Sequence, residues 1–204
     1  MRPTIFLAAA AAAAAATPAA AQTITQVSTA PKAPVTWTID PVHSELTFRV
    51  RHLLGRVNGT FGEWKGSIVA DPAMLSAGQA TIEVNVASID TRNADRDKHL
   101  RSADFFDVEK YPTMTFTSRR LVQDGQKLRL EGDLTLHGVT KPVVLTGAYA
   151  GKITDPWGKE RLAFEASTTI NRKDFGLTWS KVQEGVALVG DEVEISVALE
   201  AVRN

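Results

Sequence analysis

Residues 127–136 read KLRLEGDLTL, with leucines at positions 128, 130, 134 and 136 set between polar side chains. Successive side chains of a β-strand point to opposite faces, so this order gives one apolar and one polar face. A strand with one buried face and one face in water is typical of an antiparallel sheet. The stretch therefore predicts an antiparallel strand that covers a core.

The same alternation recurs on both sides of this stretch, and turn residues separate the runs. Residues 93–102 break the pattern, because they are polar and charged around Leu100, and they predict a short helix or ordered loop. The chain is thus predicted to be all-β, either a sandwich or a barrel. The choice matters for function, because a barrel of about eight strands can hold one small ligand. In the other runs, the positions expected on the buried face are Leu46, Phe48 and Val50; Ile82, Val84 and Val86; Phe164, Ala166, Thr168 and Ile170; and Val193, Ile195, Val197 and Leu199. The turn signals are Gly55, Asn58-Gly59, Asp71-Pro72, Asp124-Gly125, Gly138 and Asp155-Pro156.

The N-terminus has the pattern of a cleavable signal peptide. Arg2 precedes an uncharged run over 5–16, and the small residues 19–21 form an A-x-A site. The run is shorter than the ~20 residues that cross a bilayer as a helix. We therefore expect residues 1–21 to be removed after Ala21, residues 22–36 to form a flexible leader, and residues 37–204 to form one β-domain outside the cytoplasm.

Composition narrows the function. The chain has no cysteine, which excludes a lipid-anchored N-terminal cysteine, a disulfide framework and a thiol nucleophile. Lys+Arg and Asp+Glu each number 23, without a basic block. This balance argues against nucleic acid as the main partner.

Five segments in sequence resemble the YceI-like family, which is also described as polyisoprenoid-binding periplasmic proteins. The match runs in order over nearly all of residues 37–201, and no single segment would be convincing alone. The segments are Trp37-Thr-Ile-Asp40 with His43-Ser44, Phe48 and His52; Gly59-Thr-Phe61 with Gly66; Ser88-Ile-Asp-Thr91, Arg96 to Ser102, Asp104-Phe-Phe-Asp107 and Tyr111-Pro112; Gly132 to Val143; and Arg172, Asp174-Phe-Gly-Leu177 and Gly190 to Ile195.

The resemblance implies a lipocalin-like antiparallel barrel around a long apolar cavity. It implies a lipid ligand, such as an isoprenoid quinone, a polyprenyl phosphate or a fatty-acid derivative, and no other cofactor and no catalysis. On this basis some apolar side chains on or beside the buried faces would line the cavity rather than fill a core. These are Phe48, Val50, Ile82, Val84, Val86, Phe105, Phe106, Phe116, Leu134, Leu136, Phe164, Ile170 and Phe175.

The charged segment has two interpretations, which the sequence leaves open. Its Asp and Arg side chains would pair and tie the segment across one barrel end, or its Arg and His donors would meet a ligand head group at the cavity mouth. A calcium loop is disfavoured because Lys98 stands where that loop needs Gly. A zinc site is disfavoured because the four histidines form no H-x₃-H pair. The head-group candidates are Arg96, His99, Arg101, Lys141 and Arg172.

We expect Trp37 and residues 40–44 to plug one barrel end. The leading hypothesis for function is a periplasmic lipid carrier that contacts a membrane or membrane protein transiently. Two alternatives are a ligand-free interaction or stress-protective module, and an enzyme that uses His99 or His137 as an acid or base. A long exposed strand edge would also allow a homodimer.

Overall fold

The computed structural model of the chain describes residues 34–71, 74–183 and 185–204. The predicted signal peptide and its cleavage site lie outside the described residues, as does most of the predicted leader. The first strand already begins at Val35, ahead of the predicted domain start at Trp37.

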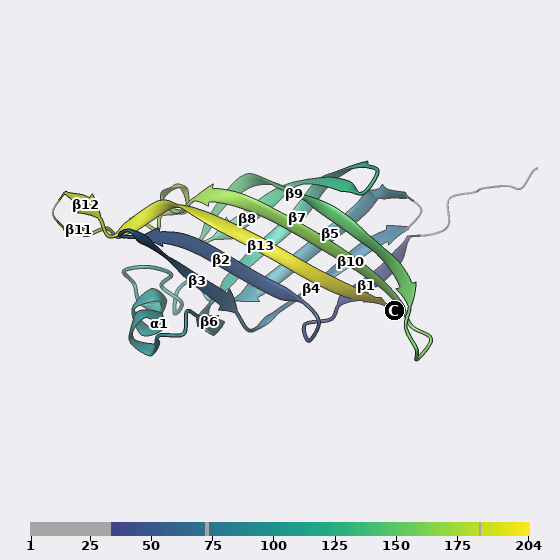
Figure 1. Cartoon of the computed structure of the whole chain (residues 1–204), viewed down its shortest axis with the longest axis horizontal. Helices are drawn as coiled ribbons and strands as arrows, with labels where there is room; N and C mark the ends of the chain where they lie inside the picture. Colours follow the sequence, from purple (N-terminus) through teal and green to yellow (C-terminus); the bar gives the residue numbers. More distant parts are fainter. Residues whose placement is uncertain (1–33, 72–73, 184) are drawn as a thin grey trace, which may run out of the picture. The chain divides into compact units, whose positions relative to one another are not determined.

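Eight strands of the described chain close into an antiparallel barrel (Figure 1). Their order around the ring is β1-β4-β5-β7-β8-β9-β10-β13, and β13 pairs back with β1. This confirms the predicted all-β class and decides between the two predicted architectures in favour of the barrel. The bounds are β1 Val35–Ile39, β4 Trp64–Asp71, β5 Met74–Asn85, β7 Thr113–Asp124, β8 Lys127–Leu136, β9 Val139–Thr154, β10 Glu160–Asn171 and β13 Val189–Arg203.

The long strand β13 has two partners on the same edge. Its residues 201–203 pair with β1, and its residues 189–198 pair with β2, Glu45–His52. The sheet continues from β2 to β3, Gly55–Phe61, and to the short β6, Ile89–Asp90. The strands β1 and β2, which a turn connects, therefore lie one after the other along the same edge of β13. A separate hairpin of β11, Val182–Gln183, and β12, Val186–Ala187, precedes β13.

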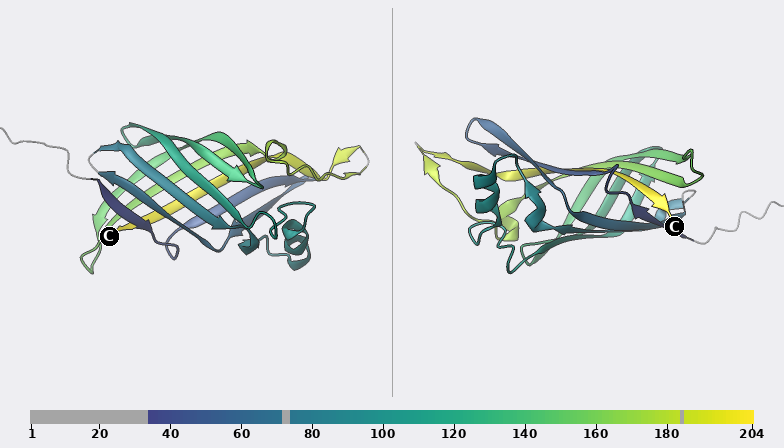
Figure 2. Two further views of the ribbon diagram at one scale, coloured as in Figure 1. Left: turned by 180° about the vertical axis from the view of Figure 1, so that it is seen from behind. Right: turned by 90° about the horizontal axis from the view of Figure 1, so that it is seen from below.

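A single α-helix, α1, Ala94–Arg101, stands among the described residues at one end of the barrel (Figures 1 and 2). It confirms the helix predicted near residues 93–102. Two 3₁₀ turns, η1 at Val86–Ser88 and η2 at Arg172–Phe175, end β5 and β10. No helix in the described part of the chain is long and apolar enough to span a membrane.

The alternating apolar side chains meet inside the barrel. In the register, Phe116 of β7 lies opposite Leu134 of β8, and Leu130 of β8 lies opposite Leu145 of β9. Trp37 and Leu162 are fully buried in this core. Burying such side chains is the main stabilising contribution to a fold without disulfides.

One predicted turn is wrong. Asn58-Gly59 lies within β3 rather than between strands. The glycine serves packing here, because a Cβ at Gly59 would lie 2.4 Å from Cζ of Phe48 on the neighbouring β2. Glycine allows the phenyl ring to lie directly over the backbone.

Candidate functional site

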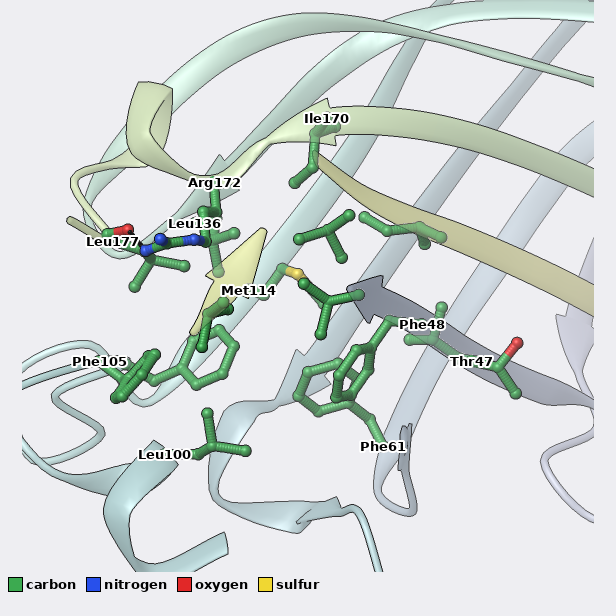
Figure 3. A pocket seen from close by; sticks show the side chains of 16 residues that line it. Thr47, Phe48, Phe61, Leu100, Phe105, Met114, Leu136, Ile170, Arg172 and Leu177 are labelled. Atoms are coloured by element: carbon green, nitrogen blue, oxygen red, sulfur yellow. Dashed lines mark hydrogen bonds between the residues drawn. The ribbon is translucent and has the colours of Figure 1, made fainter. Parts of the chain in front are cut away.

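The barrel interior contains an apolar cavity of about 90 Å³ at the α1 end (Figure 3). Figure 3 shows the rings of Phe48 and Phe61 beside one another at this cavity, with centroids 5.6 Å apart. Apart from Thr47 and Arg172, every lining side chain is apolar. The lining residues are Leu46, Thr47, Phe48, Val50, Phe61, Leu100, Phe105, Phe106, Met114, Leu136, Ile170, Arg172, Leu177, Val189, Val193 and Ile195.

Two further apolar cavities follow along the barrel. A central cavity of about 50 Å³ shares Leu46, Met114 and Ile195 with the first. A far cavity of about 80 Å³ shares four lining residues with the central one and none with the first. The three cavities therefore lie in series, with the far one at the end of the barrel away from α1. A slender apolar interior of this kind suits a hydrocarbon chain.

A more polar side cavity of about 130 Å³ opens beside the first. It shares five apolar lining residues with that cavity, among them Phe48 and Phe105. It adds the side chains of His52, Arg96 and His99. Imidazole and guanidinium groups donate hydrogen bonds, so this end of the interior is able to meet an oxygen-bearing head group.

Three rings from three segments close the side cavity. The His99 ring of α1 lies edge-on to Phe105, at 5.0 Å, and to Trp179, at 5.2 Å. Phe105 and Trp179 also contact each other at 4.9 Å. His99 Nε2 is hydrogen-bonded to Asp104 at 2.9 Å. We call His99, Phe105 and Trp179 the aromatic cluster.

Hydrogen bonds hold the N-terminal half of α1 to the segment that precedes it, and those of Asp97 are buried. Asn93 caps the helix, because its side chain accepts from the Arg96 N–H. Asp97, only 6% exposed, accepts hydrogen bonds from both the N–H and the hydroxyl of Thr91. Arg96 Nε donates to the same hydroxyl at 2.7 Å, and its Nη2 donates to the Thr91 carbonyl at 2.8 Å.

Arg101, the last residue of α1, also donates hydrogen bonds from Nε and Nη2. Arg101 donates from Nε to the carbonyl of Ala87 at 2.7 Å and from Nη2 to the carbonyl of Ile89 at 2.6 Å. Both carbonyls belong to the η1–β6 segment at the barrel edge. The charged residues of α1 therefore fasten the helix to the barrel, but through Thr91 and backbone carbonyls rather than through the Asp–Arg pairs of the first interpretation.

Arg172 makes a second buried anchor, 4% exposed. Its guanidinium donates to the carbonyls of Leu177, Trp179 and Gly190 and to the carboxylate of Asp191. Burial lowers the pKa of the guanidinium, and Asp191 opposes this effect. Arg172 thus fixes the loop that carries Leu177 and Trp179 to the cavity.

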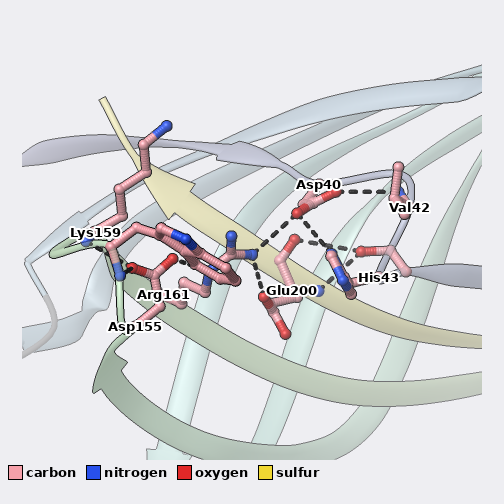
Figure 4. A network of polar contacts seen from close by, with 9 residues as sticks. Asp40, Val42, His43, Asp155, Lys159, Arg161 and Glu200 are labelled. Carbon is pink, nitrogen blue, oxygen red and sulfur yellow. Dashed lines mark hydrogen bonds and ion pairs between the residues drawn. The ribbon is translucent and has the colours of Figure 1, made fainter.

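The opposite end of the barrel is held by a polar network around Arg161 (Figure 4). Arg161 donates to Asp155 at 2.8 Å, to Asp40 at 3.0 Å and to Glu200. The hydrogen bond from His43, reinforced by Arg161, lowers the pKa of Asp40 from 3.8 to about 2. Arg161 likewise lowers the pKa of Asp155. The network joins the β1–β2 turn, the β9–β10 turn and β13.

One group of potential metal ligands is present in the described part of the chain. Asp40, His43 and Glu200 offer ligand atoms within 4.8 Å of one another. Arg161 already donates to both carboxylates. A cation at this place would therefore have to displace a guanidinium, and the donor set is better explained as a network that closes the barrel end.

The YceI-like domain family model matches residues 37–201. This chain belongs to the YceI-like family. It is 42% identical over 162 residues to Protein YceI of Escherichia coli O157:H7, covering 79% of this chain and 82% of the relative. A protein of Pectobacterium carotovorum is 41% identical over the same length and with the same coverage.

Solved structures share the YceI-like fold. The Campylobacter jejuni YceI protein is 33% identical, with a TM-score of 0.66 over 76% of this chain and 90% of that chain. Burkholderia cenocepacia BcnA is 24% identical, with a TM-score of 0.71 over 79% and 98%. A Saccharophagus degradans domain, described as polyisoprenoid binding and implicated in plant cell wall breakdown, is 17% identical, with a TM-score of 0.64 over 83% and 99%. The last two likenesses show the fold alone.

In this YceI-like barrel most of the predicted lining residues border the three cavities. Val86 and Phe175 do not, and both are buried in the core instead. The first cavity takes Phe48, Val50, Phe105, Phe106, Leu136 and Ile170; the central one takes Ile82, Val84, Phe116 and Leu134; and the far one takes Phe164 together with Ile82 and Phe116.

The predicted head-group residues are scattered. Arg96 and His99 line the side cavity, Arg172 touches the first cavity, and Arg101 is engaged by backbone carbonyls. Lys141 is exposed on β9 and does not line any of the cavities described above.

Several lining residues were not predicted. The sequence could have indicated Leu46, Val193 and Ile195, because they lie on the apolar side of alternating runs. No sequence pattern indicated Trp179, because it follows η2 in a loop whose position depends on the hydrogen bonds of Arg172.

Proposed function

We propose that this protein binds the hydrocarbon chain of a long-chain amphiphile inside the barrel and carries it in the periplasm. The observation that carries the proposal is the series of apolar cavities, which leads to polar donors at one end. The description of the Saccharophagus degradans domain as polyisoprenoid binding supports an isoprenoid chain. A quinone, a polyprenyl phosphate and a fatty-acid derivative all have the required chemistry.

Burial would provide most of the affinity, at ~0.8 kcal/mol per CH₂. The head group would lie in the side cavity, where Arg96 and His99 face it. Arg96 donates to Thr91 from Nε and Nη2, but it also lines the side cavity. Arg101 lines none of the cavities described above, and all three guanidinium nitrogens of Arg172 donate within the chain. We therefore assign these two arginines to holding the mouth. This arrangement supports a binding role rather than catalysis.

Exchange would occur at the α1 end. The segment 93–107 covers the first cavity with Leu100, Phe105 and Phe106. Its opening would expose an apolar entrance, and a brief contact with a membrane or a membrane protein would then transfer the chain. The predicted signal peptide supports the periplasm as the place of this activity.

Native mass spectrometry tests the proposal directly. The protein would be exported and purified from its own host, weighed intact, and extracted with organic solvent. We expect an added mass that moves into the organic phase. A ligand-free mass, combined with no uptake of farnesol or palmitate on incubation, would refute lipid binding.

A pair of variants tests the place of binding. Phe106 lines the first cavity and lies edge-on to Phe61 at 6.2 Å, whereas Val122 of β7 is exposed. Phe106→Asp should lose most lipid uptake and Val122→Asp should keep it, provided that both retain the wild-type circular dichroism spectrum. Equal uptake by folded Phe106→Asp would show that the chain binds elsewhere.

A further inference from the structure

The interior is not one uniform channel, because the central and the far cavity are separate spaces that share part of their lining. Four side chains line both cavities at this point: Ile82, Phe116, Leu145 and Val197. Phe116 is the one aromatic residue among them, and it is only 7% exposed. The boundary between the two cavities therefore includes one large planar side chain, the Phe116 ring.

A glycine on the neighbouring strand holds this ring in place. Gly132 stands in β8 between the inward-facing Leu130 and Leu134. A Cβ at Gly132 would lie 2.5 Å from Cε2 and from Cζ of Phe116, and 2.5 Å from the carbonyl oxygen of Thr117. The phenyl ring thus occupies the space of the missing side chain.

This packing leaves the Phe116 ring little space to move. In a close-packed interior a ring keeps its position when its neighbours leave it no alternative space. Ile82 of β5 and Leu134 of β8 lie opposite Phe116 in the registers of the two adjacent strands. An entering chain would have to displace a ring that is packed on both sides and over Gly132.

We propose that Phe116, positioned by Gly132, sets the length of hydrocarbon chain that the protein prefers. The inference rests on the proposed function. A chain that enters at α1 fills the first and central cavities, and its tail ends against Phe116. Carbon atoms beyond this length stay outside the barrel and add no affinity.

The test uses geraniol, farnesol, geranylgeraniol and solanesol, which share a head group and differ in the number of isoprene units. Each would compete with cis-parinaric acid, whose fluorescence reports occupancy. In the wild type, affinity should rise with length and then level off. In Phe116→Ala, the next longer prenol should bind at least about tenfold tighter than the length at which the wild type levels off, because another isoprene unit is buried.

Two further variants guard against trivial effects. Phe116→Leu should shift the limit in the same direction by less, and it keeps a branched apolar side chain if the alanine variant fails to fold. Leu162→Ala also removes a large, fully buried side chain, but Leu162 lines neither cavity. It should keep the wild-type dependence on length.

The outcomes separate the two proposals. If the wild type binds prenols and both Phe116 variants keep its length limit, the role of Phe116 is refuted and lipid binding stands. If Leu162→Ala shifts the limit as far as Phe116→Ala, general loosening explains the result and the role is again refuted. If neither the wild type nor any variant binds parinaric acid or a prenol, the proposed function fails, and the length limit fails with it.

Discussion

Arg172 joins η2, the following loop and the start of β13 through one buried guanidinium. Replacement by Met keeps most of the volume but leaves the carbonyls of Leu177, Trp179 and Gly190 without this donor. Unsatisfied buried acceptors are costly, so we expect Arg172→Met to lower the free energy of unfolding by about 3 kcal/mol. Urea denaturation measures the loss.

Lys173 provides the control for Arg172, because its Nζ contacts the same Asp191 at 2.8 Å but the side chain is exposed. Lys173→Met should cost less than about 1 kcal/mol. A loss in Arg172→Met no larger than that in Lys173→Met would contradict the structural role and return Arg172 to the head-group candidates.

Asp40 makes the network at the far end sensitive to acid. Its pKa falls from 3.8 to about 2 on folding, so the folded state favours the ionised carboxylate. The resulting stabilisation is fully present above pH 3.8 and disappears as the pH falls through about 2. We expect Asp40→Asn to be less stable than the wild type by about 1 kcal/mol at neutral pH.

The difference between wild type and Asp40→Asn should shrink over the same pH interval, as followed by thermal melting. Glu83→Gln removes an exposed carboxylate that pairs with Lys65, and it reports the general effect of losing one surface charge. A difference between wild type and Asp40→Asn that stays constant down to pH 2 would show that the network does not hold Asp40 ionised.

At the scale of elements, α1 depends on Asp97 for its attachment. Asp97→Ala would leave the buried N–H and hydroxyl of Thr91 without their acceptor, at a cost of about 2 kcal/mol. Asp95→Ala, in the exposed first turn of the same helix, should cost about 0.5 kcal/mol through the helix dipole. Chemical denaturation compares the two variants, and equal losses would mean that the Thr91 contacts do not anchor the helix.

The strands were predictable because their pattern is local. Alternation over 127–136 and 192–199 depends only on which face of each strand is buried, and both runs lie in strands as expected. Asn58-Gly59 misled the prediction, because a glycine that accommodates Phe48 has the same sequence appearance as a turn glycine. Closure of the barrel was not predictable from alternation, which a sandwich shares.

The site was less predictable, because it depends on contacts between distant segments. Phe48 and Phe116 could be placed on inner faces from the sequence. Which cavity each one borders depends on Gly59 and Gly132, whose effect appears only when the strands are paired. The same holds for Arg101, whose partners in η1–β6 are not evident from its own segment.

For the barrel as a whole, the two ends differ in the contacts that close them. The far end is crossed by the Arg161 network, which ties two turns to β13. The α1 end is covered by the aromatic cluster, whose rings come from three separate segments. Arg96, Arg101 and Arg172 anchor the backbone at the α1 end, but the contacts between α1, Phe105 and the Trp179 loop are aromatic. Aromatic contacts between side chains separate more easily than a network of charged hydrogen bonds, so a ligand should enter and leave between these rings.

Hydrogen–deuterium exchange, followed by mass spectrometry with and without farnesol, tests this asymmetry. A bound chain stabilises the segments that it contacts, and slower exchange reports that local stability. We expect protection over residues 93–108 and 176–181 and no change over 40–44 and 155–161. Residues 40–44 and 155–161 act as an internal control, because they belong to the Arg161 network at the opposite end of the same barrel. Protection confined to 40–44 and 155–161 would place the entrance at the Arg161 network, and the aromatic cluster would then be the closed end of the barrel.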